Sequence, residues 1–216
     1  MAQNSFIIMF CLFTCIMSDE NQLQEKESDP TYEKFQHVED VIEHQATLYM
    51  LYRTYTTDRN YECQYIQFGS KSATDTYPAT LRYRIPGKYF MERKEVTVTL
   101  TKTAYTKPQD GRPKQRTAPN ALVYTKVDED EEDDESIKGS HTYPLIYADP
   151  DICAVMRDST RDGGFGCEMY VSSSSTQPSD VCKTVYAGSC GNVKNNVWDT
   201  GCDQALEDAD DIVWDE

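Results

Sequence analysis

Eight short segments between residues 47 and 172 alternate apolar and polar side chains, and turn-forming residues separate them. Successive side chains on a β-strand point to opposite faces, so this pattern predicts strands that each bury one face. Eight such strands in one chain predict an all-β domain, either a barrel or a sandwich. The expected strands are 47–56, 62–68, 80–85, 95–101, 120–126, 142–148, 152–157 and 165–172.

Two helices are expected beside these strands. Before the first strand, apolar residues recur every three or four positions, which is typical of one amphipathic helix, and Asp29-Pro30 is a helix-start signal. A second short helix is expected at 179–187. The apolar positions of the first helix are Tyr32, Phe35, Val38, Val41 and Ile42.

The N-terminus resembles a secretory signal peptide. Residues 6–17 form an apolar run that is too short to span a bilayer, and we expect cleavage near residue 18. The expected mature chain has a flexible leader (19–30), a barrel domain (31–205) and an acidic tail (206–216). It keeps six cysteines, and an even number in an oxidising compartment predicts three disulfides among fifteen possible pairings.

The net charge of −16 argues against binding to nucleic acid or to anionic membranes, and no later segment is apolar enough for a membrane span. Residues 128–135 are eight consecutive acids. This run could capture calcium, form a surface for a partner, or be a solvated loop. It lacks the spaced ligands and the glycine of a calcium loop, so we expect no metal site.

The segment Cys167-Glu168-Met169-Tyr170-Val171 is the most informative part of the last expected strand. Alternation places Cys167, Met169 and Val171 on one face, with Glu168 and Tyr170 on the other. Alternation alone does not say which face is inside. Because glutamate is rarely buried without a partner, alternation alone favours an exposed Glu168.

Several motifs, in this order and at this spacing, resemble those of tick salivary lipocalins, the histamine-binding protein family. They are the leading helix, Tyr55-Thr56-Thr57-Asp58 before Tyr61-Glu62-Cys63, the pair Ile152-Cys153, and the segment 167–171. The resemblance implies an eight-stranded antiparallel lipocalin barrel that is closed at one end, with an N-terminal and a C-terminal helix packed outside and a ligand cavity within.

The resemblance also implies a disulfide pattern. It pairs Cys63 with Cys202, Cys153 with Cys182, and Cys167 with Cys190. A bridge from Cys167 to a segment outside the barrel would place Glu168 and Tyr170 inside, which reverses the preference from alternation alone.

By the same resemblance, Glu168 contacts the ammonium group of an amine, and Tyr55 and Tyr124 help to enclose the ligand. Asp58 corresponds to an acid of a second amine site. Tyr170 stands where the family usually has a tryptophan, and it keeps an aromatic wall for a cation.

Two further family positions for cavity acids hold Pro144 and Ala154 instead. This departure leaves open a lipid ligand, such as a leukotriene, a fatty acid or a sterol. An acidic lipid would need a cationic anchor, for which Arg53 and Arg82 are candidates, with Lys94 a weaker one. Tyr55 and Tyr124 could instead fill the barrel, and both arginines could point outward.

No nucleophile elbow, phosphate-binding glycine loop or paired-histidine metal motif is present, so we expect no enzyme and no cofactor. The leading hypothesis is a secreted, monomeric salivary lipocalin that sequesters a small host mediator, a biogenic amine such as histamine or serotonin, and suppresses inflammation. The alternatives are a lipid mediator, or a host immune protein bound through two charged loops, the basic segment 102–116 and the acidic run 128–135.

Overall fold

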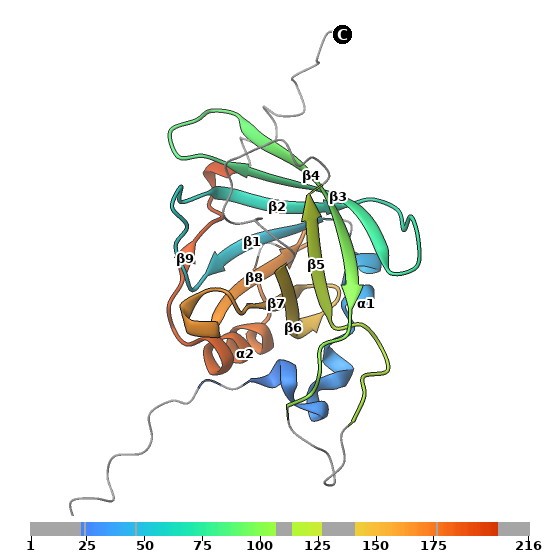
Figure 1. Ribbon diagram of the computed structural model, residues 1–216. Helices are drawn as coiled ribbons and strands as arrows, with labels where there is room; N and C mark the ends of the chain where they lie inside the picture. Colours follow the sequence, from blue (N-terminus) through green and yellow to red (C-terminus); the bar gives the residue numbers. More distant parts are fainter. Residues whose placement is uncertain are drawn as a thin grey trace, which may run out of the picture.

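The computed structural model describes residues 23, 25–45, 47–106, 114–126, 141–175 and 177–202. Its strands form one antiparallel sheet that curls into a barrel (Figure 1). The strands are β1 (Thr47–Arg53), β2 (Glu62–Phe68), β3 (Thr76–Arg84), β4 (Met91–Thr101), β5 (Ala121–Lys126), β6 (His141–Asp149), β7 (Cys153–Asp158), β8 (Gly166–Ser172) and β9 (Asn195–Asn196). The helices are η1 (Lys26–Ser28), η2 (Pro30–Phe35), α1 (Val38–His44), η4 (Asp162–Gly164) and α2 (Asp180–Cys190).

The sheet closes because β1 pairs with both β2 and β8. Each of β2 to β7 also pairs with the next strand along the chain, so the first eight strands form a closed antiparallel barrel. The predicted eight-stranded barrel is therefore confirmed. The short strand β9 was not predicted. It pairs with the C-terminal end of β1, where Arg53 is opposite Asn195.

Two apolar clusters lie on opposite sides of the barrel wall. The inner cluster fills the barrel and includes Leu48, Met156 and Tyr170. The outer cluster lies between the wall and α2, and it includes Met169 and Tyr186. Tyr170 and Met169 are neighbours in sequence but belong to different clusters, as expected for a strand buried on both faces. In Figure 1, α2 lies beside β7 and β8 on the outside of the barrel.

The N-terminal helix is broken, whereas the sequence pattern predicts one continuous helix. A 3₁₀ turn, η2, ends at Phe35, and α1 begins at Val38. Between them, the buried Gln36 side chain donates hydrogen bonds to the carbonyls of Lys26 and Ile146, and it accepts one from Arg116. These tertiary hydrogen bonds hold the backbone at the break, and a periodicity argument cannot see them.

The predicted flexible leader, 19–30, is wrong for its last residues. Lys26–Ser28 forms η1, and Glu27 is buried against the barrel. The Nε atom of Arg157, on the outward face of β7, donates to Glu27 Oε1 at 2.5 Å. Arg116 donates to the Glu27 carbonyl. Two buried arginines therefore fix the start of the domain.

The described residues contain three disulfides, and they are the pairs that the family resemblance implies: Cys63–Cys202, Cys153–Cys182 and Cys167–Cys190. The last two join β7 and β8 to α2, which holds the helix against the outer face of the barrel. Because Cys167 points outward to α2, its neighbour Glu168 points inward.

The predicted signal peptide (1–18), the acidic run (128–135) and the acidic tail (206–216) lie outside the described residues. Across the ranges that the structure covers, no helix has the length and apolar character needed to cross a membrane. The same ranges contain no group of three or more metal-ligating side chains of His, Cys, Asp or Glu.

Candidate functional site

The barrel contains a cavity at the end that carries the β1–β2 connection, away from α1. Side chains from β1, β2, β3, β4, β5, β6, β7 and β8, and from the β1–β2 and β7–β8 connections, line it. Its volume is about 60 Å³. On the same volume scale, one buried water needs about 10–15 Å³. The cavity therefore has room for a compact ligand but not for a long acyl chain.

Glu168 lies at the inner wall of this cavity and is only 4 % exposed. Its carboxylate accepts hydrogen bonds from two phenols. Tyr170 donates to Oε2 at 2.8 Å, and Tyr55 donates to Oε1. Tyr55 follows the end of β1, and Tyr170 lies two residues along β8 on the same inward face. The structure therefore brings together three of the predicted site residues.

Burial raises the pKa of Glu168 to about 7, and the negative charge of Asp158 acts in the same direction. The hydrogen bonds from Tyr55 and Tyr170, and the positive charge of Arg53, oppose this shift without cancelling it. Near neutral pH the carboxyl group is therefore poised between its neutral and ionised forms. A cation beside it would favour the ionised form.

This pKa predicts a loss of stability with rising pH in the ligand-free protein. The ordinary carboxyl pKa is 4.5 and the folded value is about 7, so the folded state holds the proton more tightly. The free energy of unfolding should fall from about pH 5 to pH 8, by about 3 kcal/mol for a shift of this size. Urea unfolding at both pH values checks this. Glu168→Gln should lack the decrease, whereas Glu43→Gln, at an exposed site, should keep it; an equal decrease in both variants would contradict the assignment.

Asp158 is a second cavity acid that sequence reasoning missed. It ends β7, is 4 % exposed and lines the cavity. Its Oδ1 accepts hydrogen bonds from the backbone N and the hydroxyl of Thr160, at 2.9 and 2.6 Å. The predicted strand ended at residue 157, one residue too early. The available signal was alternation, since Asp158 lies two residues beyond the inward-facing Met156.

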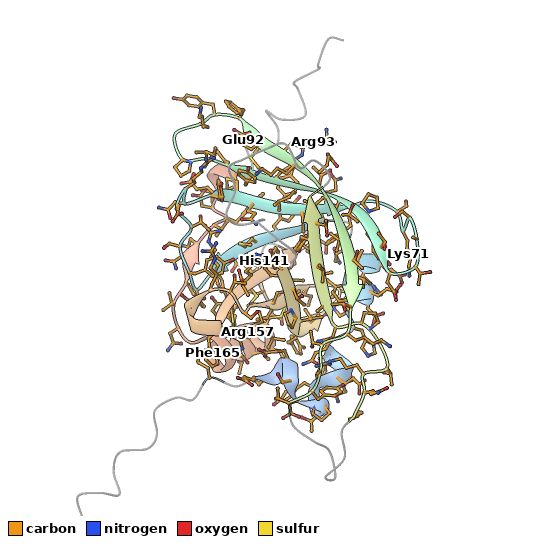
Figure 2. The ribbon with its side chains drawn as sticks, viewed as in Figure 1. Lys71, Glu92, Arg93, His141, Arg157 and Phe165 are labelled. Atoms are coloured by element: carbon orange, nitrogen blue, oxygen red, sulfur yellow. A yellow bond between two sulfur atoms is a disulfide. The ribbon has the colours of Figure 1, made fainter. Side chains whose placement is uncertain are left out.

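Two arginines and a histidine line the same cavity. Arg53 is 4 % exposed, Arg161 is half-buried in the β7–β8 connection, and His141 begins β6. Figure 2 shows His141 near the middle of the barrel, whereas Arg157 and Phe165 lie together on the side of α2. The guanidinium carbons of Arg53 and Arg161 lie 5.4 and 5.6 Å from the centre of the Tyr55 ring.

The other predicted residues are divided between the cavity and the surface. Tyr124 of β5 lines the cavity, and burial raises its pKa far above the ordinary value, so its hydroxyl stays neutral. Asp58 is exposed in the β1–β2 turn and does not line this cavity. Ala154 is packed in the inner cluster, and Arg82, although half-buried, is not a cavity residue.

Gly166 fixes the geometry of the β7–β8 connection, which carries both Asp158 and Arg161. A Cβ atom at this position would lie 2.6 Å from Arg161 Cβ and 2.7 Å from the Asp158 carbonyl oxygen. We expect Gly166→Ala to lower the free energy of unfolding by about 1–3 kcal/mol through this overlap. Gly188→Ala in α2 is the control, because its Cβ would lie 3.8 Å from the nearest atom. Thermal unfolding compares them, and equal midpoints would contradict the role given to Gly166.

Comparisons with known proteins agree with this architecture. The family model of the tick histamine-binding protein matches residues 26–204. Among solved structures, Japanin from Rhipicephalus appendiculatus bound to cholesterol is 15 % identical, with a TM-score of 0.52, and the match covers 76 % of this chain and 98 % of that one. The AM182 serotonin complex is 20 % identical, with a TM-score of 0.49, and the match covers 77 % and 91 %.

No curated protein sequence matches the chain significantly. The family match, however, extends from η1 to the residues just after Cys202, which closes the Cys63–Cys202 disulfide. It therefore includes every strand of the barrel and all three disulfides. On this evidence the chain is a lipocalin-like barrel protein that belongs to the tick histamine-binding protein family.

Proposed function

We propose that the protein sequesters a small biogenic amine, such as histamine or serotonin, inside the barrel. The observation that carries this proposal is Glu168, a buried carboxylate that faces the cavity and is held by the hydroxyls of Tyr55 and Tyr170. A protonated amine gives up its hydration on entering a barrel, so it needs a countercharge in the cavity. Glu168 supplies that countercharge.

The rest of the cavity supports a compact cation. Tyr55, Tyr124, Tyr143 and Tyr170 present phenol rings, which attract a cation over their faces and make dispersion contacts with a flat ligand. Asp158 adds a second negative charge to the cavity, in place of the acids missing at Pro144 and Ala154. The family's name supports an amine ligand in the same way.

Calorimetric titration of the mature protein with histamine and with serotonin at pH 8 tests this function. We expect saturable binding of at least one amine with a stoichiometry near one, and no turnover of the ligand. The absence of binding heat with both amines, at several temperatures so that a zero enthalpy is not mistaken for no binding, would refute it.

A lipid mediator with a carboxylate is the second candidate, and Arg53 and Arg161 favour it because both guanidinium groups line the cavity. The small cavity weighs against it. Native mass spectrometry of the purified protein distinguishes the two candidates. A co-purifying fatty acid or eicosanoid would support the lipid, and an empty barrel that takes up neither would exclude it.

The protein is proposed to act outside the cell as a stoichiometric binder of a host mediator, and so to limit inflammation. Three disulfides in a domain of this size suit an oxidising, extracellular compartment. Mass determination of the secreted protein would show whether residues 1–18 are removed, as we expect for a signal peptide.

A further inference from the structure

The two acids of the cavity, Glu168 and Asp158, have neutral hydrogen-bond partners among the described residues. Glu168 is bound by two phenols, and Asp158 by Thr160. Within the described part of the chain, no ion pair joins either acid to Arg53 or Arg161. Opposite charges inside a protein normally pair, since an unpaired charge in a low dielectric is costly.

The two arginines have only neutral partners there. Arg53 donates to the side chains of Gln64 and Thr57 and to the Tyr61 carbonyl, at 3.5, 3.1 and 3.3 Å. Its Nε is buried and has no hydrogen-bond partner. For the Arg161 guanidinium group, the contact seen within the described ranges is the one with the Tyr55 ring. Among the described residues, no carboxylate forms an ion pair with either guanidinium group, and the two groups thus form a positive pole.

Tyr55 contacts both the positive pole, which is Arg53 and Arg161, and the negative pole of the cavity, which is Glu168. Its hydroxyl donates to Glu168, and its ring lies within 5.6 Å of both guanidinium carbons. The distance between the two poles is therefore comparable to the size of one phenol. A single compact ligand could reach both.

We propose that the preferred ligand is amphoteric: a small aromatic amino acid or a close derivative, with its ammonium group at Glu168 and its carboxylate at Arg161 and Arg53. This inference rests on the proposed function and deepens it, because the ammonium site is the same. One such ligand neutralises both poles, whereas a simple amine leaves the arginines without a countercharge and a fatty acid leaves Glu168 without one. The ring would lie among the cavity tyrosines.

Ring-matched probes separate the two poles. In each series one compound carries only the amine, one only the carboxylate, and one carries both: tyramine, 3-(4-hydroxyphenyl)propionate and tyrosine, with the equivalent indole and imidazole series. In at least one series we expect the compound with both groups to bind roughly tenfold or more tighter than the amine, since charge-assisted hydrogen bonds to arginine are strong. Calorimetry at pH 8 measures all nine.

Substitutions then show which residue binds the ammonium group and which binds the carboxylate of the ligand. Arg161→Gln should weaken binding of the amphoteric compound roughly tenfold and change binding of the amine less than about twofold, while Arg161→Lys should recover part of the loss. Glu168→Gln should weaken both compounds. Arg93→Gln is the control, because Arg93 is on β4 and its side chain is 60 % exposed.

The possible outcomes separate the two proposals. If amines bind through Glu168 but no amphoteric compound binds tighter, or if Arg161→Gln has no selective effect, the inference is wrong and the amine function stands. If only the carboxylate compounds bind, and Glu168→Gln changes nothing, both proposals fail and the cavity is an anion site. If none of the nine compounds binds, both proposals are also rejected.

Discussion

Replacing Glu168 with glutamine is expected to weaken the binding of histamine or serotonin by roughly 150- to 5,000-fold at pH 8. The substitution keeps the shape of the side chain and an oxygen that can accept a hydrogen bond from Tyr55 or Tyr170, but it removes the only countercharge held by those phenols. Breaking a buried charge pair by removing one partner costs about 3–5 kcal/mol, which corresponds to this loss of affinity. Calorimetric titration of both proteins gives the ratio.

The pH dependence of the same binding identifies the ionised form of Glu168 as the partner. Because its pKa is about 7, the apparent affinity for an amine should fall about tenfold for each pH unit below 7 and level off above it. In Glu168→Gln this slope should disappear. A slope that survives in the variant would mean that a group other than Glu168 controls the pH dependence of binding.

Replacing Arg157 with methionine is expected to lower the free energy of unfolding by about 3–5 kcal/mol. Arg157 is 2 % exposed, and its guanidinium group donates to the Glu27 carboxylate and to the carbonyls of Phe165 and Ser189. The change would leave the buried Glu27 carboxylate without its ion-pair partner and detach η1 from β7. Urea unfolding of the wild type and the variant gives the difference.

A surface pair provides the matched control for this second prediction. Arg93 and Glu95 are close on β4, but their side chains are 60 % and 46 % exposed, so Arg93→Met should cost under about 1 kcal/mol. Removing both buried charges, with Glu27→Leu and Arg157→Met, should recover part of the loss, because the carboxylate is no longer left unpaired. Equal costs for Arg157→Met and Arg93→Met would contradict the account.

The barrel was predictable from the sequence because strand alternation is a local property. All eight predicted strands are present, and the bounds of 62–68 coincide with those of β2. The break at Gln36 and the ordering of Glu27 were not predictable, since they depend on residues 80 and 130 positions away, Arg116 and Arg157. A local sequence pattern does not identify contact partners that are so far away in the chain.

The candidate site was predictable only in part, for a similar reason. The inward orientation of Glu168 came from the expected bridge between Cys167 and Cys190, which the structure contains. Asp158 was missed because the end of a strand is the least certain part of a pattern. Arg161 lies in a connection without a regular pattern, so only the closed barrel brings it to the cavity.

The most direct test of the central claim is the number of protons released when an amine binds at pH 6. If Glu168 has a pKa of about 7 and must ionise to hold the ammonium group, binding should release about 0.9 proton at pH 6 and almost none at pH 8.5. Calorimetry in two buffers with different ionisation enthalpies measures this number. The account predicts release from the wild type and none from Glu168→Gln; equal release from both, or none from either, would contradict it.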